Sequence, residues 1–316
     1  MNKKIIEDML TKKFNHWVNS ITDENVKKLV KDNTIITGGC IVSMLENNDI
    51  NDYDIYFTNK ETVKEVAKYY VKLFNNRKNN RNAFVVDGSI SLADQDDENK
   101  TVFFLDEISY NEIPEDRIKI CIRNFEEDVF DTKENEPLKN YTVNHNNLIE
   151  NKNKTENGKY FPVFLTENAI TLSDKIQIVI RFYGDAEEIH SNFDYVHCTN
   201  YWKSSNKKLY LNKDALESII TKQLYYTGSK YPLCSIFRSR KFIKRGWHIN
   251  AGQFLKMAIQ LNELNLKDIC VLRDQLVGVD TLYFIDLLSR IEKRKKEDPN
   301  FIIDDSFIIS LVDEIF

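Results

Sequence analysis

The sequence predicts an α/β protein in which a small mixed sheet, with helices on one face, is followed by a helical domain. Three observations indicate this class. Helical periodicity at the N-terminus gives way to short apolar strands, a Gly-Gly turn joins the first strand to a helix, and helical patterns dominate after residue 200. With 42% hydrophobic and 29% charged residues, the chain can bury a sizeable core, which excludes a globally disordered protein.

Apolar spacing defines the elements of the first 75 residues. Thr22 is the expected N-cap of the second helix, because Glu24 follows in its first turn. The predicted elements are, in order, helices over 3–19 and 22–31, a strand over 34–37, a helix over 40–45, a strand over 53–57 and a helix over 60–75.

The middle of the chain, residues 76–160, is less regular and is interpreted as an insertion on the core. Its end, residues 139–158, is rich in asparagine and poor in apolar side chains, which is typical of a mobile surface loop. The fold resumes at Phe161. Strands are predicted in and after the insertion over 83–90, 101–105, 117–122, 176–182 and 193–198.

Helical patterns dominate the C-terminal part. We therefore expect a catalytic-type domain over 1–200 and a helical domain over 201–316. The helices predicted in the second domain span 213–222, 235–245, 251–263, 268–276 and 280–295.

Several classes of protein and site are disfavoured by composition. The five cysteines and five histidines are scattered without metal-ligand spacing, so neither a disulfide framework nor a zinc site is expected. No apolar stretch is long enough for a membrane helix. Glu7 and Asp8 stand where a signal peptide needs an apolar run, so we expect a cytoplasmic protein, in the host cytoplasm if it is viral.

The segment from Thr34 to Phe57 carries the chemistry, since Gly38-Gly39 precedes Asp52-Tyr53-Asp54 on an apolar strand. Residues i and i+2 of a strand share one face about 6.6 to 7 Å apart, so Asp52 and Asp54 project together. Such a carboxylate pair favours Mg²⁺ or Mn²⁺, which completes its shell with water and phosphate oxygens. The glycines before a helix N-terminus leave backbone N–H groups open to the phosphates of a nucleotide.

Each of these signals also has a simpler interpretation. Asp-x-Asp occurs by chance in an acidic chain, as Asp94 and Asp96 show, and a Gly pair after a strand is usually a tight turn. Order and context favour a catalytic-type site, because Asp52 and Asp54 open an apolar strand behind Gly-Gly, whereas Asp94 and Asp96 sit in an acidic loop without glycines.

This segment resembles the nucleotidyltransferase superfamily typified by DNA polymerase beta and by the poly(A) and CCA-adding polymerases. Residues 167–202 and the stretch SIFRSRKFIKRGW resemble later parts of nucleotidyltransferase-like proteins of phages and large viruses. The resemblance covers about 34–57 and 165–247. Val42 and Ser43 stand where the CCA-adding branch has Arg and Asp, which argues against the base selection of that branch.

The resemblance implies the nucleotidyltransferase fold and a third carboxylate beside Asp52 and Asp54, and Asp194 matches its position. Asp87 and Asp106, each at the end of an apolar run, are the alternatives. It also implies that two Mg²⁺ ions held by these carboxylates support in-line transfer from ATP or another nucleoside triphosphate.

A basic segment is the second candidate site. Residues 218–262 contain eight Lys and Arg residues and no acid, although the whole chain has a net charge of −5. Arg238, Lys241 and Arg245 lie on the predicted helix 235–245 and are candidates to bind the triphosphate, an acceptor RNA or tRNA, or the protein's own acidic insertion. Four nearby aromatic residues could stack a base, although core packing is favoured for each: Tyr201, Trp202, Tyr225 and Tyr226.

The function expected from these features is Mg²⁺-dependent nucleotidyl transfer from a nucleoside triphosphate to an acceptor hydroxyl, with release of pyrophosphate. The alternative is an inactive protein of the same fold that binds nucleotide or nucleic acid as an interaction module. The presence of both Asp52 and Asp54 favours the enzyme. The nature of the acceptor does not follow from the fold.

Overall fold

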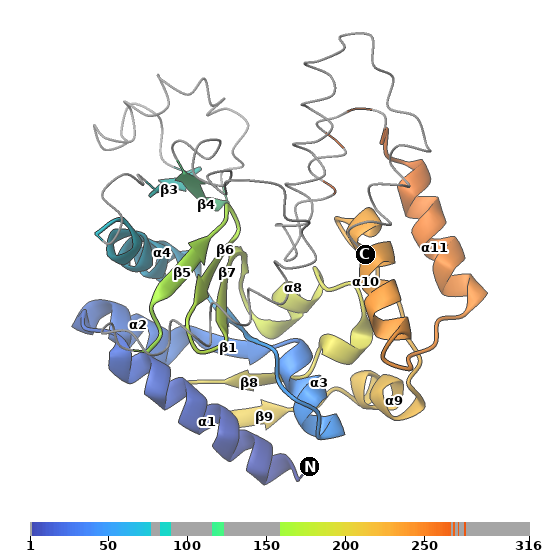
Figure 1. Ribbon diagram of the computed structural model, residues 1–316, viewed down its shortest axis with the longest axis horizontal. Coiled ribbons are helices and arrows are strands. Elements are labelled where there is room, and N and C mark those ends of the chain that lie inside the picture. The colour runs from blue at the N-terminus through green and yellow to red at the C-terminus, as the bar shows by residue number, and fades with distance from the viewer. Residues whose placement is uncertain are drawn as a thin grey trace, which may run out of the picture. The chain divides into compact units, whose positions relative to one another are not determined.

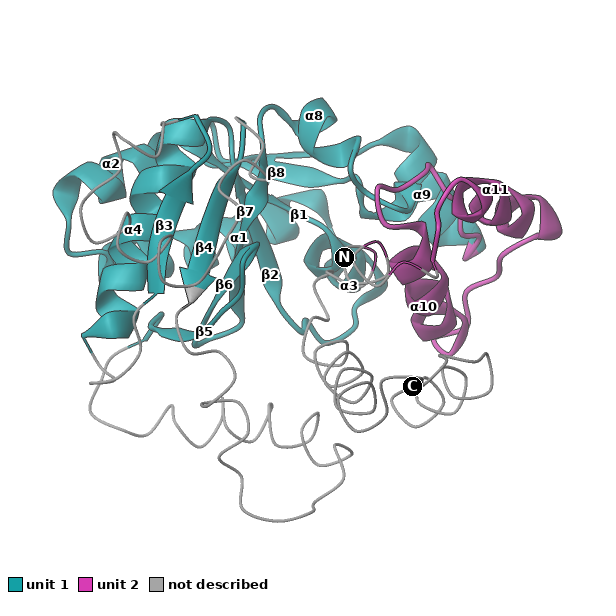
Figure 2. Ribbon diagram, turned by 90° about the horizontal axis from the view of Figure 1, so that it is seen from above, with its two compact units in different colours: residues 1–134, 149–221 teal, residues 135–148, 222–316 magenta. Residues whose placement is uncertain are grey.

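The computed structural model describes residues 2–76, 83–89, 116–122 and 159–266, together with residues 268, 271 and 275. Over these residues the protein is α/β, with a seven-stranded mixed sheet and a two-stranded sheet, which confirms the predicted class (Figure 1). The chain divides into two compact units, which Figure 2 distinguishes by colour. Unit 1 comprises residues 1–134 and 149–221, and unit 2 comprises residues 135–148 and 222–316.

The first elements of unit 1 follow the predicted order, with bounds that differ by no more than two residues. They are α1 (Lys3–Ser20), α2 (Glu24–Asn33), β1 (Thr34–Thr37), α3 (Gly39–Glu46), β2 (Tyr53–Phe57) and α4 (Lys60–Asn75).

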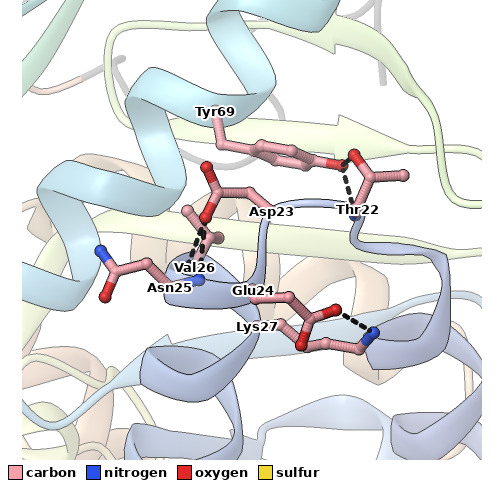
Figure 3. A network of polar contacts seen from close by, with 7 residues as sticks. All are labelled: Thr22, Asp23, Glu24, Asn25, Val26, Lys27 and Tyr69. Atoms are coloured by element: carbon pink, nitrogen blue, oxygen red, sulfur yellow. Dashed lines mark hydrogen bonds and ion pairs between the residues drawn. The ribbon is translucent and has the colours of Figure 1, made fainter.

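The N-terminus of α2 corrects one detail of the prediction. Asp23, and not Thr22, is the N-cap, because its carboxylate accepts hydrogen bonds from the backbone N–H groups of Asn25 (2.9 Å) and Val26 (3.1 Å). Thr22 instead uses its backbone N–H to bind the Tyr69 hydroxyl on α4 (3.1 Å), as Figure 3 shows. The cap and this contact fix the turn between α1 and α2 against α4.

The predicted insertion contributes to the core where it is described. Strands β3 (Ala83–Asp87) and β4 (Ile118–Ile122) form an antiparallel pair, and Ala83, Ile118 and Ile120 belong to the main core. The predicted strand 101–105 and loop 139–158 lie outside the described residues.

The rest of unit 1 contains the predicted strand 176–182 as β7 and the predicted helix 213–222 as α9, together with shorter strands that the periodicity did not predict. It consists of β5 (Pro162–Leu165), β6 (Ala169–Leu172), β7 (Ile176–Tyr183), α8 (Ala186–His190), the 3-10 helix η3 (Val196–Cys198), β8 (Tyr201–Lys203), β9 (Lys208–Tyr210) and α9 (Lys213–Thr221).

The predicted strand over 193–198 is wrong. This segment is irregular before η3, and its last carbonyl, that of Cys198, accepts a hydrogen bond from the Gly38 N–H (3.2 Å) and lies 3.2 Å from the Thr37 hydroxyl. The strand that pairs with β1 is β8. Residues 201–210 therefore belong to the sheet, while the division into domains at residue 200 stays a prediction.

The order of the large sheet is β5-β6-β7-β2-β1-β8-β9. Only β2 and β7 pair in parallel among the described strands, and the other neighbours are antiparallel. Because directly paired residues share a face, the register defines rows across the sheet. One row is wholly apolar and almost fully buried: Ile170, Ile178, Ile55, Ile36, Trp202 and Leu209.

The two faces of the sheet are covered unequally. The apolar row packs in one core with residues of α1, α2, α3 and α4. On the opposite face, a smaller cluster joins Ile35, Tyr56 and Val179 to Ala186 and Ile189 of α8. Helices therefore lie on both faces, and the expectation of helices on one face is corrected by α8.

Unit 2 is described over α10 (Pro232–Ile243) and α11 (Ala251–Asn262), which pack against each other. Helix α10 starts three residues before the predicted bound of 235, because Pro232 suits its first turn. The predicted helices 268–276 and 280–295 lie outside the described segments, apart from residues 268, 271 and 275.

A buried hydrogen bond between α1 and α4 yields a test of the core. The Trp17 indole N–H donates to the Tyr70 hydroxyl (2.7 Å), and both side chains are almost fully buried. Tyr70→Phe should lower the free energy of unfolding by about 1–2 kcal/mol, because the indole N–H loses its partner without reaching water. Urea unfolding measures this loss.

Tyr69→Phe is the matched control, since its hydroxyl binds the exposed Thr22 N–H, which water can satisfy (Figure 3). Tyr69→Phe should change the free energy of unfolding by no more than about 0.5 kcal/mol. Equal losses in the two variants would show that the buried hydrogen bond has no special weight.

Candidate functional site

The Gly38-Gly39 turn lies directly against the Asp54 carboxylate. Gly38 has φ +85° and ψ −152°, a conformation that only glycine adopts readily. A Cβ on Gly38 would lie 2.7 Å from Asp54 Oδ2, whereas a Cβ on Gly39 would meet nothing within 4 Å. The turn therefore needs glycine at position 38 both for its backbone and for the approach of the carboxylate.

The turn opens helix α3 without a side-chain cap. Gly38 is the N-cap residue and makes no side-chain hydrogen bond to the helix. The N–H groups of a first turn and the positive end of the helix dipole together attract anions. Phosphate oxygens are thus suitable ligands for this end of α3.

Asp54 is the second residue of β2, and the register places it on the face opposite the apolar row. Asp52 directly precedes the strand, and its place on the same face stays a prediction. Both side chains are partly exposed. Carboxylates that reach solvent are suited to a hard divalent cation.

The Cys40 thiol shows that both carboxylates act on the start of α3. Burial raises the pKa of Cys40 well above its usual value, and the negative charges of Asp54 and Asp52 raise it further. The side chain is 1% exposed and its Sγ lies 3.5 Å from the Thr37 carbonyl oxygen. Cys40 is therefore a protonated packing residue rather than a nucleophile.

The row through Asp54 is polar and aromatic, in contrast to the apolar row next to it. Asp54 pairs with Thr37 on β1 and with Gln177 on β7. Thr37 and Gln177 were not predicted as site residues. The polar residue at the end of TIIT and the one within IQIVI were the available signal, but only the register shows that both flank Asp54.

Thr37 is held in place by α8 and by the segment after η3. Its hydroxyl lies 2.8 Å from the Asn200 carbonyl oxygen, and His190 Nε2 lies 2.9 Å from the same hydroxyl. If the hydroxyl donates to Asn200, His190 donates through Nε2–H. Burial lowers the pKa of His190 to about 4, so the imidazole is neutral at neutral pH.

The three candidates for the third carboxylate have different surroundings. Asp194 is 8% exposed and lies in the irregular segment before η3, not on a strand. Asp106 lies outside the described residues. Asp87 ends β3 and forms ion pairs with Lys60 (2.7 Å) and Lys64 (3.0 Å).

The ion pairs of Asp87 occupy its carboxylate. Burial tends to raise the pKa of Asp87, but hydrogen bonds from Lys60, Ser89 and Lys64 outweigh burial and hold the pKa far below its usual value. Asp87 therefore joins β3 to α4 as a structural residue. Across the described segments, no three His, Cys, Asp or Glu side chains are grouped so that they could hold a metal ion.

The predicted basic residues belong to unit 2, whereas Asp54 belongs to unit 1. Arg238 and Lys241 lie on α10 and Arg245 follows it; Arg238 is partly exposed and the other two are exposed. Two further basic residues of the segment have local roles. Lys222 Nζ lies 5.0 Å from the centre of the Trp247 ring, and Lys256 donates to the carbonyls of Tyr226 and Thr227.

The four aromatic candidates divide by burial. Trp202 and Tyr226 are core residues, with 0% and 3% exposure. Tyr201 is partly exposed, and Tyr225 is 37% exposed.

None of the helices in the described part of the chain is long and apolar enough to cross a membrane.

Comparison with known proteins assigns the family. A family model described as "Gabija anti-defense 2 family protein" matches residues 8–222. The chain belongs to this family. The match covers the Gly-Gly turn, both site carboxylates, Asp194 and the whole large sheet, and it ends one residue after unit 1 ends.

A curated relative is Gabija anti-defense 2 of Bacillus phage SPbetaL7, which is 25% identical over 128 residues. The aligned part is 40% of this chain and 31% of the relative, so the chain spans about a third of the relative's length. The phage source of the relative agrees with the resemblance to phage proteins.

A solved structure with similarity is that of the Thermotoga maritima CCA-adding enzyme complexed with tRNA. It covers 93% of this chain and 57% of its own, at 12% identity and a TM-score of 0.36. This likeness is too low to assign a fold.

The Gly38 turn permits a paired mutational test. Gly38→Ala should lower the free energy of unfolding by about 1–3 kcal/mol, because alanine is strained at this φ and its Cβ displaces the Asp54 carboxylate. Gly39→Ala, with open space around the new Cβ, should change it by less than about 0.5 kcal/mol. Urea unfolding of both variants measures the difference, and equal effects would contradict the close approach.

His190 predicts a pH dependence of stability. Its pKa of about 4 in the folded protein is below the usual 6.5, so between these values the unfolded chain binds the proton and the folded chain does not. Stability should therefore fall as the pH drops from about 6.5 to about 4, by no more than about 3 kcal/mol from this group.

Urea unfolding at several pH values should show that His190→Gln reduces this acid loss. His16→Gln, at an exposed position on α1, is the control and should keep it. An unchanged pH profile in His190→Gln would show that folding does not lower the pKa of this imidazole.

Proposed function

We propose that this protein transfers a nucleoside monophosphate from a nucleoside triphosphate to an acceptor hydroxyl. The observation that supports this most is the contact of the Gly38 turn with the Asp54 carboxylate. It brings a helix N-terminus suited to phosphate beside a carboxylate suited to a cation. Nucleotidyl transfer requires both within the length of one triphosphate.

The first turn of α3 would bind the phosphates of the donor. Asp52 and Asp54 would hold Mg²⁺ or Mn²⁺, and their oxygen donors, closeness in the chain and partial exposure fit such an ion. When bound, the ion would neutralise charge on the phosphates and polarise the phosphoryl group undergoing transfer. The fixed turn and strand would orient the donor so that little reorganisation is needed.

In the proposed step, the acceptor oxygen bonds to the α-phosphorus while the bond between that phosphorus and the β-phosphate oxygen breaks. Pyrophosphate leaves with the electron pair, and the hydroxyl proton passes to a carboxylate or to water. Asp194 remains our candidate to orient the acceptor and to complete a metal site. Gln177, the lateral neighbour of Asp54, would donate or accept a neutral hydrogen bond there.

Three basic side chains of unit 2 are a further part of the proposal. Arg238, Lys241 and Arg245 would bind phosphates of the donor or of an RNA or tRNA acceptor. Their binding would weaken with salt, because each phosphate contact releases counterions.

Membership of an anti-defense family adds a biological role to the proposal. We infer that the protein acts against the host defence named Gabija, in the cytoplasm of an infected cell, and that host defence components are among its partners. Transfer of a nucleotide to such a component, or to a nucleic acid, would be one route to inhibition.

The second candidate is a protein that binds nucleotide or nucleic acid without turnover. It is favoured by one observation, the neutral Gln177 where a third carboxylate could flank Asp54. The two candidates differ in one measurable product, pyrophosphate.

The test combines pyrophosphate release with thermal stability. Wild-type protein with Mg²⁺, each of the four nucleoside triphosphates and total RNA or protein from host cells should release pyrophosphate. Asp54→Asn should lower the rate of pyrophosphate release at least about 100-fold, because the metal ion that would neutralise the phosphate charge loses a carboxylate ligand. Asp49→Asn, at an exposed acid just before the site, is the control and should retain the activity.

Binding without turnover has a separate outcome. Mg²⁺ and nucleotide at about 100 times the dissociation constant should stabilise the wild type by about 2.7 kcal/mol, and Asp54→Asn should lose most of this gain. Stabilisation without pyrophosphate would favour the second candidate. The absence of both stabilisation and pyrophosphate release would reject both candidate functions.

Asp194→Asn should reduce turnover far more than nucleotide affinity if Asp194 serves the acceptor.

A further inference from the structure

The short segment that carries Asp52 is irregular, because β2 begins only at Tyr53. The strand pairing that fixes Asp54 between β1 and β7 therefore stops short of Asp52. Two apolar side chains anchor the segment: Ile50 packs against the main core, and Tyr53 is 9% exposed. Asp52 itself is partly exposed, so contacts to its neighbours in the chain decide where its carboxylate can lie.

Lys175 binds this segment on both sides of Asp52. It is the last residue of the turn between β6 and β7, and its Nζ donates to the Ile50 carbonyl oxygen (2.9 Å). The carbonyl oxygen of Lys175 accepts a hydrogen bond from the Tyr53 backbone N–H (2.7 Å). A single residue thus bridges positions 50 and 53, and Asp52 lies inside the bridge.

The turn that presents Lys175 is itself fixed by α1. The Lys13 ammonium on α1 donates to the Asp174 carbonyl oxygen. The same ammonium lies 5.1 Å from the centre of the Tyr53 ring and 4.9 Å from that of the Tyr160 ring, and both rings are buried. These contacts hold residues 174 and 175 in place, so the Lys175 bridge has a rigid base.

A simpler interpretation is that the Lys175 contacts only stabilise the hairpin and the core beside it. The side-chain part of the bridge, however, comes from an exposed lysine, and changes at exposed positions usually affect stability little. The same bridge matters far more if the carboxylates bind a cation. Outer contacts that orient a metal ligand typically change metal affinity about 10- to 100-fold.

We infer that Lys175 is a positioning residue for Asp52. Its bridge would hold residues 50–53 so that the carboxylates of Asp52 and Asp54 reach one divalent cation together. The inference rests on the proposed function, because that function assigns the cation to these two carboxylates. In this role Lys175 acts through the segment it binds, so its loss should weaken metal binding while the fold is kept.

Titration of the whole protein with Mn²⁺ alone, followed through the electron paramagnetic resonance signal of the free ion, tests this role without turnover. The Mn²⁺ binding that Asp54→Asn removes defines the site. Lys175→Met and Lys175→Gly, which both lose the ammonium, should weaken this binding about tenfold. Lys175→Arg keeps an N–H donor and should bind Mn²⁺ within about threefold of the wild-type affinity.

A lysine in another hairpin supplies the matched control. Lys207, in the turn between β8 and β9, is exposed and has a φ of 56°, close to the 62° of Lys175. Because glycine suits this φ, Lys175→Gly and Lys207→Gly should each unfold within about 3 °C of the wild type. Lys207→Gly should keep the wild-type Mn²⁺ affinity, because its turn follows Lys203, at the other end of β8 from the residue that shares a row with Asp54.

Three results would overturn the role of Lys175 and leave the transferase proposal intact. The first is an equal Mn²⁺ affinity in the wild type and Lys175→Gly, and the second is an equal loss in Lys175→Gly and Lys207→Gly. The third is a loss in Lys175→Gly with wild-type affinity in Lys175→Met, which would assign the effect to flexibility of the turn.

The arginine variant and the wild type give the remaining outcomes. A loss in Lys175→Arg as large as that in Lys175→Met would overturn the inference, because the N–H donor would then have no effect. If Lys175→Gly fails to fold, Lys175→Met and Lys175→Arg decide. Absence of Mn²⁺ binding that depends on Asp54 would reject the metal site of the proposed function, and with it the role of Lys175.

Discussion

The register of β1, β2 and β7 depends on the burial of one isoleucine row. Ile36, Ile55 and Ile178 are each no more than 1% exposed and lie side by side in the main core. A slip of one residue in any of these strands would turn its isoleucines to the other face, at a cost of about 2 kcal/mol or more for each side chain. The same constraint places Thr37, Asp54 and Gln177 together on the opposite face.

Core packing therefore also positions the candidate site. The buried isoleucines fix the register of the strands, and this register alone brings residues 37, 54 and 177 side by side. The Gly38 turn follows β1 without a gap, so the start of α3 inherits the same position relative to Asp54. Only glycine at position 38 lets the two meet as closely as they do.

Sequence periodicity was sufficient for elements whose own residues determine them. Helices α1 and α4 show a full apolar stripe, and β2 is a short run of buried residues interrupted by Asp54. The face of Asp54 could be predicted for this reason, whereas that of Asp52, which precedes the strand, stays a prediction. The predictions of a metal site and of a third carboxylate stay untested.

Elements decided by distant partners could not be predicted. Strands β8 and β9 have three residues each, too few for a period to be visible, and are strands because β1 offers a free edge. Phe193 to Cys198 has the composition of a strand but bends, because the Cys198 carbonyl accepts from the Gly38 N–H. The pairing of Gln177 with Asp54 could not be predicted either, because strand register depends on residues far apart in the sequence.

The parallel pair of β2 and β7 has a consequence for how this family can vary. Parallel strands must be joined by a crossover, and here the crossover runs from Thr58 to Lys175, more than a third of the chain. The free-energy cost of closing such a long connection rises by only about 0.6 kcal/mol when its length doubles. Helix α4 and strands β3 to β6 of this crossover pack in the core or the sheet, so only the connections between them can change in length at so small a cost. Changes of length in those connections need not move Asp54 or its neighbours, because the paired strands hold the site.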